Sequence, residues 1–213
     1  MNRKLLNTAF ILSIITIVYN VAEGIVSIYF GLEDETLSLL GFGSDSFVEV
    51  ISGIGIAHMV LRMKYTKVEQ TDKFERQALR ITGVAFYLLT SGIIIGSIIN
   101  IVQNNKPETT MPGIIISLLS IATMYFLMHY KLKVGKKLNS DAIISDANCT
   151  KSCFYLSIVL LLSSILYEIF QIGYIDIIGS LAIAWFTFKE GKEAFDKVKK
   201  NKISCCCNNT CNN

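Results

Sequence analysis

The stretch SDANCTKSCFYLSIVLLLSSILYEIF, residues 145–170, decides what kind of fold this sequence can form. Its second half is almost wholly apolar, and the whole stretch is long enough to cross a bilayer, which takes about 20 residues of helix. Its first two turns nevertheless carry Asp146, Cys149, Lys151 and Cys153. Ionisable residues within a membrane span are costly and mark functional sites. The stretch therefore predicts a membrane helix with a polar site inside it.

The rest of the chain repeats this apolar pattern. The sequence is 52% hydrophobic and 17% charged, whereas a soluble domain carries about 25% charged residues. Six apolar blocks are joined by short loops, at about residues 6–31, 37–62, 79–102, 111–131, 142–169 and 174–190. We therefore expect an all-α polytopic membrane protein with six transmembrane helices. Residues 1–198 would form the membrane domain, and residues 199–213 a short, disordered, Cys-rich cytoplasmic tail.

Basic residues lie almost entirely on one side of the expected membrane. With the N-terminus in the cytoplasm, the inner segments hold nearly all Lys and Arg residues. The outer loops then hold only one basic residue, Lys106, beside the acidic run Glu33, Asp34 and Glu35. This asymmetry predicts a multi-pass protein of the plasma membrane with both termini in the cytoplasm. Because the charges adjoin helix ends, we do not expect a nucleic-acid partner.

Polar residues deep inside the expected spans are concentrated in three of them. The first span carries Asn20 and Glu23, the second carries Asp45 and Glu49, and the fifth carries the residues quoted above. The third and fourth spans have no ionisable residue deep inside and are interpreted as scaffold. The functional residues are therefore expected where spans 1, 2 and 5 meet.

Two pairs of residues in these spans share a spacing of four, which places each pair on one helix face. Asp45 and Glu49 lie about eight and twelve residues from the outer end of their span, and Cys149 and Cys153 lie about seven and eleven from the inner end of theirs. At a rise of about 1.5 Å per residue, both pairs fall near the midplane. Two carboxylates and two thiols suit a four-coordinate soft cation such as Zn²⁺, Cd²⁺ or Cu⁺. The alternatives are a structural polar contact for the carboxylates and small packing residues for the cysteines.

These motifs resemble the transmembrane domain of the cation diffusion facilitator family, whose members export zinc, cadmium, iron, cobalt or manganese in exchange for protons. The segment DSFVE, Asp45–Glu49, is similar to the D-x-x-x-D motif of the family's second helix. DANCTKSC, Asp146–Cys153, aligns without gaps with the fifth-helix pattern D/E-A-x-H-x-x-S-D. The resemblance covers residues 8–198, including a sixth-helix-like segment at residues 174–195.

The resemblance implies a metal site formed by Asp45, Glu49, Cys149 and Cys153. Helices 1, 2, 4 and 5 would enclose it, with helices 3 and 6 outside. The implied activity is secondary active export of a divalent metal ion by proton antiport and alternating access, in a homodimer. The protein would be a transporter and not an enzyme, with the metal as cargo and no fixed cofactor.

The chain departs from the family pattern in two respects. Both fifth-helix ligands are cysteines, so we expect a softer metal preference than that of the His/Asp form. The family's cytoplasmic C-terminal domain, a small α/β metal-sensing dimer, is expected to be missing, which leaves the basis of dimerisation open. A non-transporting membrane metal sensor on the same fold is the alternative function. A membrane thiol oxidoreductase is a third reading.

Other polar residues are candidates for accessory roles. Asn20 and Glu23 could relay protons, add a ligand or form a hydrogen bond between helices. Asp146 could guard the inner mouth, cap its helix or bind metal directly. The four tail cysteines could pick up soft metal, carry lipid or have no function; they are Cys205, Cys206, Cys207 and Cys211.

Overall fold

A computed structural model describes residues 3–66, 73–103, 106–108 and 110–200 of the 213 residues. Within these ranges the chain forms six α-helices and no strand, which confirms the predicted all-α fold. The helices are α1 (Arg3–Glu33), α2 (Leu37–Thr66), α3 (Lys73–Gln103), α4 (Met111–Leu138), α5 (Asp141–Phe170) and α6 (Tyr174–Lys200). The four cysteines of the predicted C-terminal tail lie outside the described residues.

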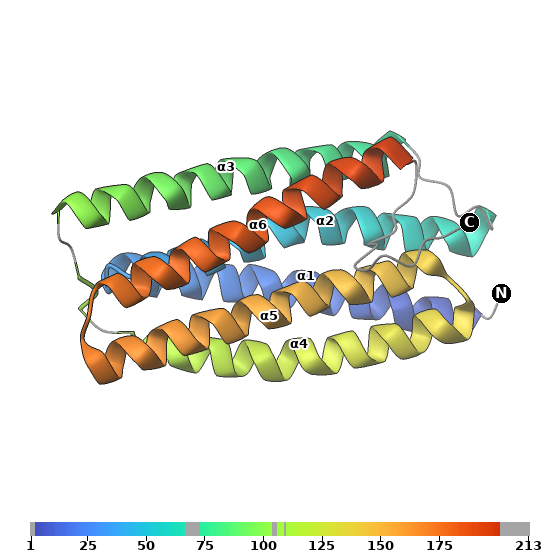
Figure 1. Cartoon of the computed structure of the whole chain (residues 1–213). Coiled ribbons are helices and arrows are strands. Elements are labelled where there is room, and N and C mark those ends of the chain that lie inside the picture. The colour runs from blue at the N-terminus through green and yellow to red at the C-terminus, as the bar shows by residue number, and fades with distance from the viewer. Residues whose placement is uncertain (1–2, 67–72, 104–105, 109, 201–213) are drawn as a thin grey trace.

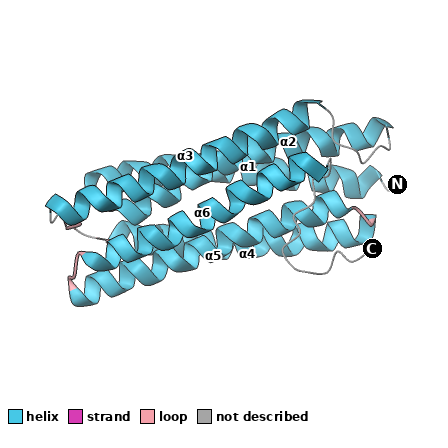
Figure 2. Ribbon diagram, turned by 45° about the horizontal axis from the view of Figure 1, so that its top comes forward, coloured by secondary structure: helices cyan, strands magenta, loops and turns pink. Residues whose placement is uncertain are grey.

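The helices run alternately in opposite directions, so α1 begins and α6 ends at the same end of the bundle (Figures 1 and 2). Four of them form a closed ring, in which α1 packs on α2, α2 on α5, α5 on α4 and α4 on α1. The other two, α3 and α6, pack against each other; both contact α2, and α6 also contacts α5. This is the arrangement that the family resemblance implied.

Five helices are long and apolar enough to cross a membrane, by length and composition. They are α1 and the parts of α2 to α5 at residues 37–63, 76–103, 111–138 and 146–170. The chain is therefore a multi-pass membrane protein. Helix α6 is predominantly apolar only over residues 174–188, about 22 Å of helix, before Lys189 and Glu190. Its role as a sixth span stays a prediction, which its packing along α3 favours.

The inside of the bundle is rich in small polar residues, while its outside is apolar. Large side chains such as Val18, Leu88 and Leu119 are more than half exposed. Buried serines and threonines line the helix contacts instead, for example Ser120, which accepts a hydrogen bond of 2.8 Å from Ser157 between α4 and α5. Small residues let helices approach closely where lipid offers no hydrophobic drive for association. The pattern is that of a bundle surrounded by lipid.

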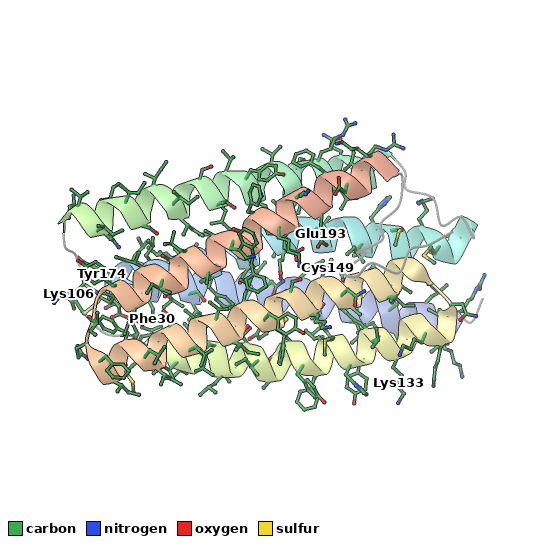
Figure 3. All side chains as sticks on the ribbon, in the orientation of Figure 1. Phe30, Lys106, Lys133, Cys149, Tyr174 and Glu193 are labelled. Carbon is green, nitrogen blue, oxygen red and sulfur yellow. The ribbon has the colours of Figure 1, made fainter. Side chains whose placement is uncertain are left out.

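The two ends of the bundle differ in charge. Lys133 lies toward the end at which α1 begins and α6 ends, and Lys106 lies at the opposite end, with Cys149 between them (Figure 3). The loop at the Lys106 end is acidic, and Asp34 in it is buried. Burial and the nearby charges of Glu33, Glu108 and Glu168 raise the pKa of Asp34.

Asp176 joins the first turns of α2 and α6 at this acidic end. Its carboxylate accepts hydrogen bonds from the backbone N–H groups of Leu37 (2.9 Å) and Ser38 (3.2 Å) and from the Ser38 hydroxyl. The first N–H groups of a helix have no partner within the helix, so a side chain from another helix replaces water here. Asp176 is 1% exposed, and it acts as a cap for α2 although it belongs to α6.

Replacing Asp176 by Ala should destabilise the bundle by about 1–2 kcal/mol, the usual loss for a helix N-cap. The reason is that two buried N–H groups would lose their acceptor. The expected result is a melting temperature several degrees lower in detergent. Asp196→Asn, at an exposed position of the same helix, is the control and should melt like the wild type. Equal melting of all three proteins would contradict the capping role.

Candidate functional site

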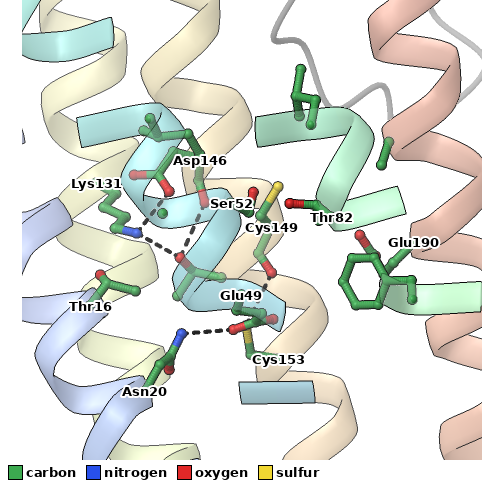
Figure 4. A pocket seen from close by; sticks show the side chains of 16 residues that line it. Thr16, Asn20, Glu49, Ser52, Thr82, Lys131, Asp146, Cys149, Cys153 and Glu190 are labelled. Carbon is green, nitrogen blue, oxygen red and sulfur yellow. Dashed lines mark hydrogen bonds and ion pairs between the residues drawn. The ribbon is translucent and has the colours of Figure 1, made fainter. Parts of the chain in front are cut away.

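Glu49 of α2 is held between α1 and α5. The amide Nδ2 of Asn20 donates a hydrogen bond of 3.0 Å to Glu49 Oε2. The thiol of Cys153 donates to the other carboxylate oxygen, Oε1 (Figure 4). Three helices of the ring thus meet at one carboxylate. The structure thus brings Asn20, Glu49 and Cys153 of these three helices together.

Small residues make this convergence geometrically possible between α1 and α2. A Cβ added at Gly43 would lie 2.7 Å from the Cβ of Ser27, and one at Gly24 would lie 2.8 Å from the ring of Phe47. A side chain at Gly43 would require the helices to move apart, and one at Gly24 would require the Phe47 ring or the helices to shift. The two backbones are therefore close enough for polar side chains of moderate length to bridge them. Glu23 Oε2 accepts a hydrogen bond of 3.0 Å from the Ser46 hydroxyl in the same interface.

A cavity lies beside Glu49, in the half of the bundle nearer the start of α1 and the end of α6. Five residues singled out from the sequence line it, namely Asn20, Glu49, Asp146, Cys149 and Cys153. Neither cysteine is in a disulfide. Cys149 is half-buried and Cys153 is buried, so the two thiols face the cavity to different degrees. Carboxylate, thiol and amide groups that line one cavity are suited to bind a cation.

Asp45 and Glu23 do not line this cavity. Asp45 is buried one turn from Glu49 on the same helix, and its Oδ1 accepts no hydrogen bond from any described residue. Across the described ranges, no three His, Cys, Asp or Glu side chains are grouped so that they could hold a metal ion as they stand. The four predicted ligands therefore lie on the expected helices and faces, but they are not assembled around a common point.

Comparison with known proteins places the chain in a family. Residues 9–198 match the model of the cation efflux transmembrane domain. The chain belongs to the cation efflux family. It is also 29% identical over 187 residues to an uncharacterized transporter of Methanocaldococcus jannaschii, a match that covers 86% of this chain and 65% of that protein. Family membership confirms the resemblance to the cation efflux transmembrane domain that the second-helix and fifth-helix motifs indicated.

The interpretation of spans 3 and 4 as scaffold was wrong in this member of the cation efflux family. Lys131 of α4 is 1% exposed and lines the cavity, and Thr82 of α3 lines it as well. Lys131 Nζ forms an ion pair of 3.0 Å with Asp146 Oδ1. From the sequence, Lys131 was counted among the charges at the inner membrane surface. The sequence does contain a signal for this ion pair. Lys131 and Asp146 lie on opposite arms of the α4–α5 hairpin, at similar distances along the chain from the turn at Asn139.

Glu190 of α6 is a second residue that sequence reasoning missed. It lies where the apolar part of α6 ends, within the segment 174–195 that resembles the family's sixth helix. In the structure it lines the cavity opposite α5 (Figure 4). The helices outside the ring therefore also contribute to the cavity, through Thr82 and Glu190.

The different burial of the two thiols predicts different reactivity. Cys149 should react faster than Cys153 with methyl methanethiosulfonate, because Cys153 is 5% exposed and bonded to Glu49. The measurement is mass spectrometry of the labelled peptides after timed exposure of the purified protein. The four tail cysteines are replaced by Ser, so that only these two thiols react.

A matched variant tests the role of the hydrogen bond. Glu49→Ala removes the acceptor for the Cys153 thiol, so Cys153 should be labelled faster. The difference in labelling rate between Cys149 and Cys153 should therefore become smaller. If Cys153 reacts as fast as Cys149 in the parent protein, the described packing around Glu49 is wrong.

Proposed function

We propose that this protein is a secondary active exporter of soft or borderline divalent metal ions such as Zn²⁺ or Cd²⁺, driven by proton entry and working by alternating access. The observation that carries the proposal is the contact of Glu49 with Cys153 beside a cavity that also holds Cys149. A carboxylate and two thiols in a membrane interior suit a soft cation that needs deprotonated ligands. Membership of the cation efflux family supports the same class of cargo.

In the proposed cycle, the metal enters from the cytoplasm into the cavity and binds Glu49, Cys149 and Cys153. Asp45 joins as the fourth ligand after rotation of its side chain, since it lies one turn from Glu49 on the same face. The position of the cavity in the half of the bundle near the termini supports cytoplasmic entry, if both termini are cytoplasmic as the distribution of basic residues predicts. Exposure to the other side then allows protons to replace the metal.

Metal and protons compete for the same atoms in this scheme. A thiol binds metal as thiolate and a carboxylic acid as carboxylate, so binding releases protons and protonation releases metal. A transporter that changes its exposure only in the metal-loaded or the protonated form exchanges one for the other. Asn20 would hold Glu49 in place during this exchange, and Glu23 would serve as an accessory proton site. We further propose a homodimer in the plasma membrane.

Transport in proteoliposomes tests the proposal. With an acidic lumen and a neutral bath, Cd²⁺ and Zn²⁺ should enter the vesicles while an internal pH dye reports loss of protons, and a reversed gradient should slow uptake. Glu49→Gln and Cys153→Ser should each reduce the initial rate by about tenfold or more, since each removes a ligand.

The matched control is Asp196→Asn, which alters an exposed carboxylate on α6 and should transport like the wild type. Metal binding without flux in the wild type would contradict export and favour a sensor. Flux that persists in both ligand variants would contradict the site.

The cysteines should set the metal preference. Cys149→His with Cys153→Asp recreates the ligand types that the resemblance gives for the family's fifth helix. The double variant should lose preference for Cd²⁺ relative to Mn²⁺ and Co²⁺, because imidazole and carboxylate favour harder ions than thiolate does. The measurement is the ratio of initial uptake rates in the same vesicles. An unchanged ratio would show that the two thiols are not ligands.

A further inference from the structure

Lys131 is a buried, positively charged residue in the wall of the cavity that the proposed metal would enter. Its ammonium donates to Asp146 Oδ1 and to Thr150 Oγ1, each at 3.0 Å. The side chains of Lys131 and Asp146 are 2% and 8% exposed. Glu49, Cys149 and Cys153 line the same cavity (Figure 4). The ammonium group is therefore a resident cation beside the predicted ligands.

A structural role alone gives a weak account of this pair. Burying an ion pair costs desolvation energy that its mutual attraction barely offsets, so a buried pair is poor evidence for added stability. The α4–α5 hairpin is also secured by other contacts, among them the left-handed cap at Asn139 and the hydrogen bond between Ser157 and Ser120. Because the pair lies in the cavity wall, we interpret its role as setting the charge of the cavity.

We propose that Lys131 is a tethered cation that balances the negative charge of the empty cavity, and that an entering divalent metal ion displaces it from Asp146. The proposal rests on the export function proposed above and adds a residue that sets metal affinity. Like charges in a low-dielectric space repel strongly, so the metal and the ammonium cannot both stay close to the same carboxylates. The affinity for the metal therefore depends on how much more strongly the metal binds in the cavity than the ammonium group of Lys131 does.

The surroundings of Lys131 let the ammonium move without losing every partner. Thr150 Oγ1 accepts from Lys131 Nζ and donates to the backbone oxygen of Asp146 at 3.1 Å. Thr150 can therefore keep the ammonium bound to α5 when Asp146 turns toward the metal. When the metal leaves, the ammonium returns to Asp146, which prevents the emptied carboxylates from holding the ion. Lys131 thus favours release, which an exporter needs as much as binding.

Changes at the two partners of this ion pair should shift metal affinity in opposite directions. Lys131→Met removes the competing charge and should lower the Kd for Cd²⁺ by about tenfold, a coupling of ordinary size between two ligands. Asp146→Asn keeps the ammonium but removes its carboxylate, and should raise the Kd by a similar factor. Lys131→Arg keeps the charge and should bind nearly as the wild type does. The double change of Lys131→Met with Asp146→Asn should fall between the single variants.

The measurement is equilibrium dialysis of Cd²⁺ against the purified full-length protein in detergent, together with the melting temperature of each variant. A structural role for the ion pair predicts that both single changes lower stability and weaken binding. Tighter binding by Lys131→Met beside weaker binding by Asp146→Asn supports the tethered cation. Binding by Lys131→Met that is equal to or weaker than that of the wild type overturns it. Unchanged affinity in Asp146→Asn also overturns the proposal, and this test stands even if Lys131→Met does not fold.

Flux separates this inference from the function on which it rests. In proteoliposomes, Lys131→Met should take up Cd²⁺ at a lower maximal rate than the wild type, because release is slowed, while needing less Cd²⁺ for half-maximal rate. Wild-type transport with an unchanged concentration dependence in Lys131→Met overturns the tethered cation alone. A wild type that neither binds nor moves Cd²⁺ overturns the export function and the inference together.

Discussion

A carboxylate inside a bundle surrounded by lipid needs partners, and Glu49 finds them on two other helices. A charged or polar group in this environment cannot turn to water, so its hydrogen bonds must come from the protein. Asn20 on α1 and Cys153 on α5 supply them. These contacts define how α1, α2 and α5 are rotated about their axes, and the ring closes through α4. The position of every other cavity residue depends on this alignment.

The two helices outside the ring form a pair with polar contacts of their own. Thr90 and Thr187 are joined by a hydrogen bond of 2.9 Å, and Ser97 and Ser180 by one of 3.1 Å. Such contacts join α3 and α6 to each other, whereas α1 and α4 lie on the side of the ring away from this pair. Asp176 then ties α6 to the start of α2 at the acidic end. The bundle thus consists of the ring of α1, α2, α4 and α5 and the attached pair of α3 and α6. The cavity lies where the ring and the pair meet, toward the end opposite the acidic end.

The sequence allowed the helices and the helix faces of the candidate site to be predicted, but not its contacts. Long apolar blocks locate spans because a helix satisfies its backbone hydrogen bonds within its own segment in lipid. A spacing of four places Glu49 with Asp45 and Cys153 with Cys149 on common faces. The rotation of one helix against another depends on packing of small residues such as Gly43 with Ser27. No residue count reveals that rotation, so the engagement of Glu49 by Asn20 and the position of Asp45 outside the cavity were out of reach.

Lys131 shows a different limit of sequence reasoning. Lysines at helix ends are normally solvated, and a rule that counts them for membrane orientation takes no account of where each side chain points. The α4–α5 hairpin folds Lys131 against Asp146 because the two lie at similar distances from the turn at Asn139. A search for opposite charges at matching distances from a tight turn would have found this pair.

The thiols have a consequence for the charge of the empty cavity. Glu49, Asp146 and Glu190 bring carboxyl groups to it, and Lys131 alone among the described cavity residues carries a positive charge. Two aspartates in place of Cys149 and Cys153 would add further negative charge to a space with little water. A neutral thiol avoids that cost while the site is empty and becomes anionic only as it gives up its proton to bind metal. Under the proposed function, thiol ligands make proton release a part of metal binding, which is the exchange that the proposed antiport requires.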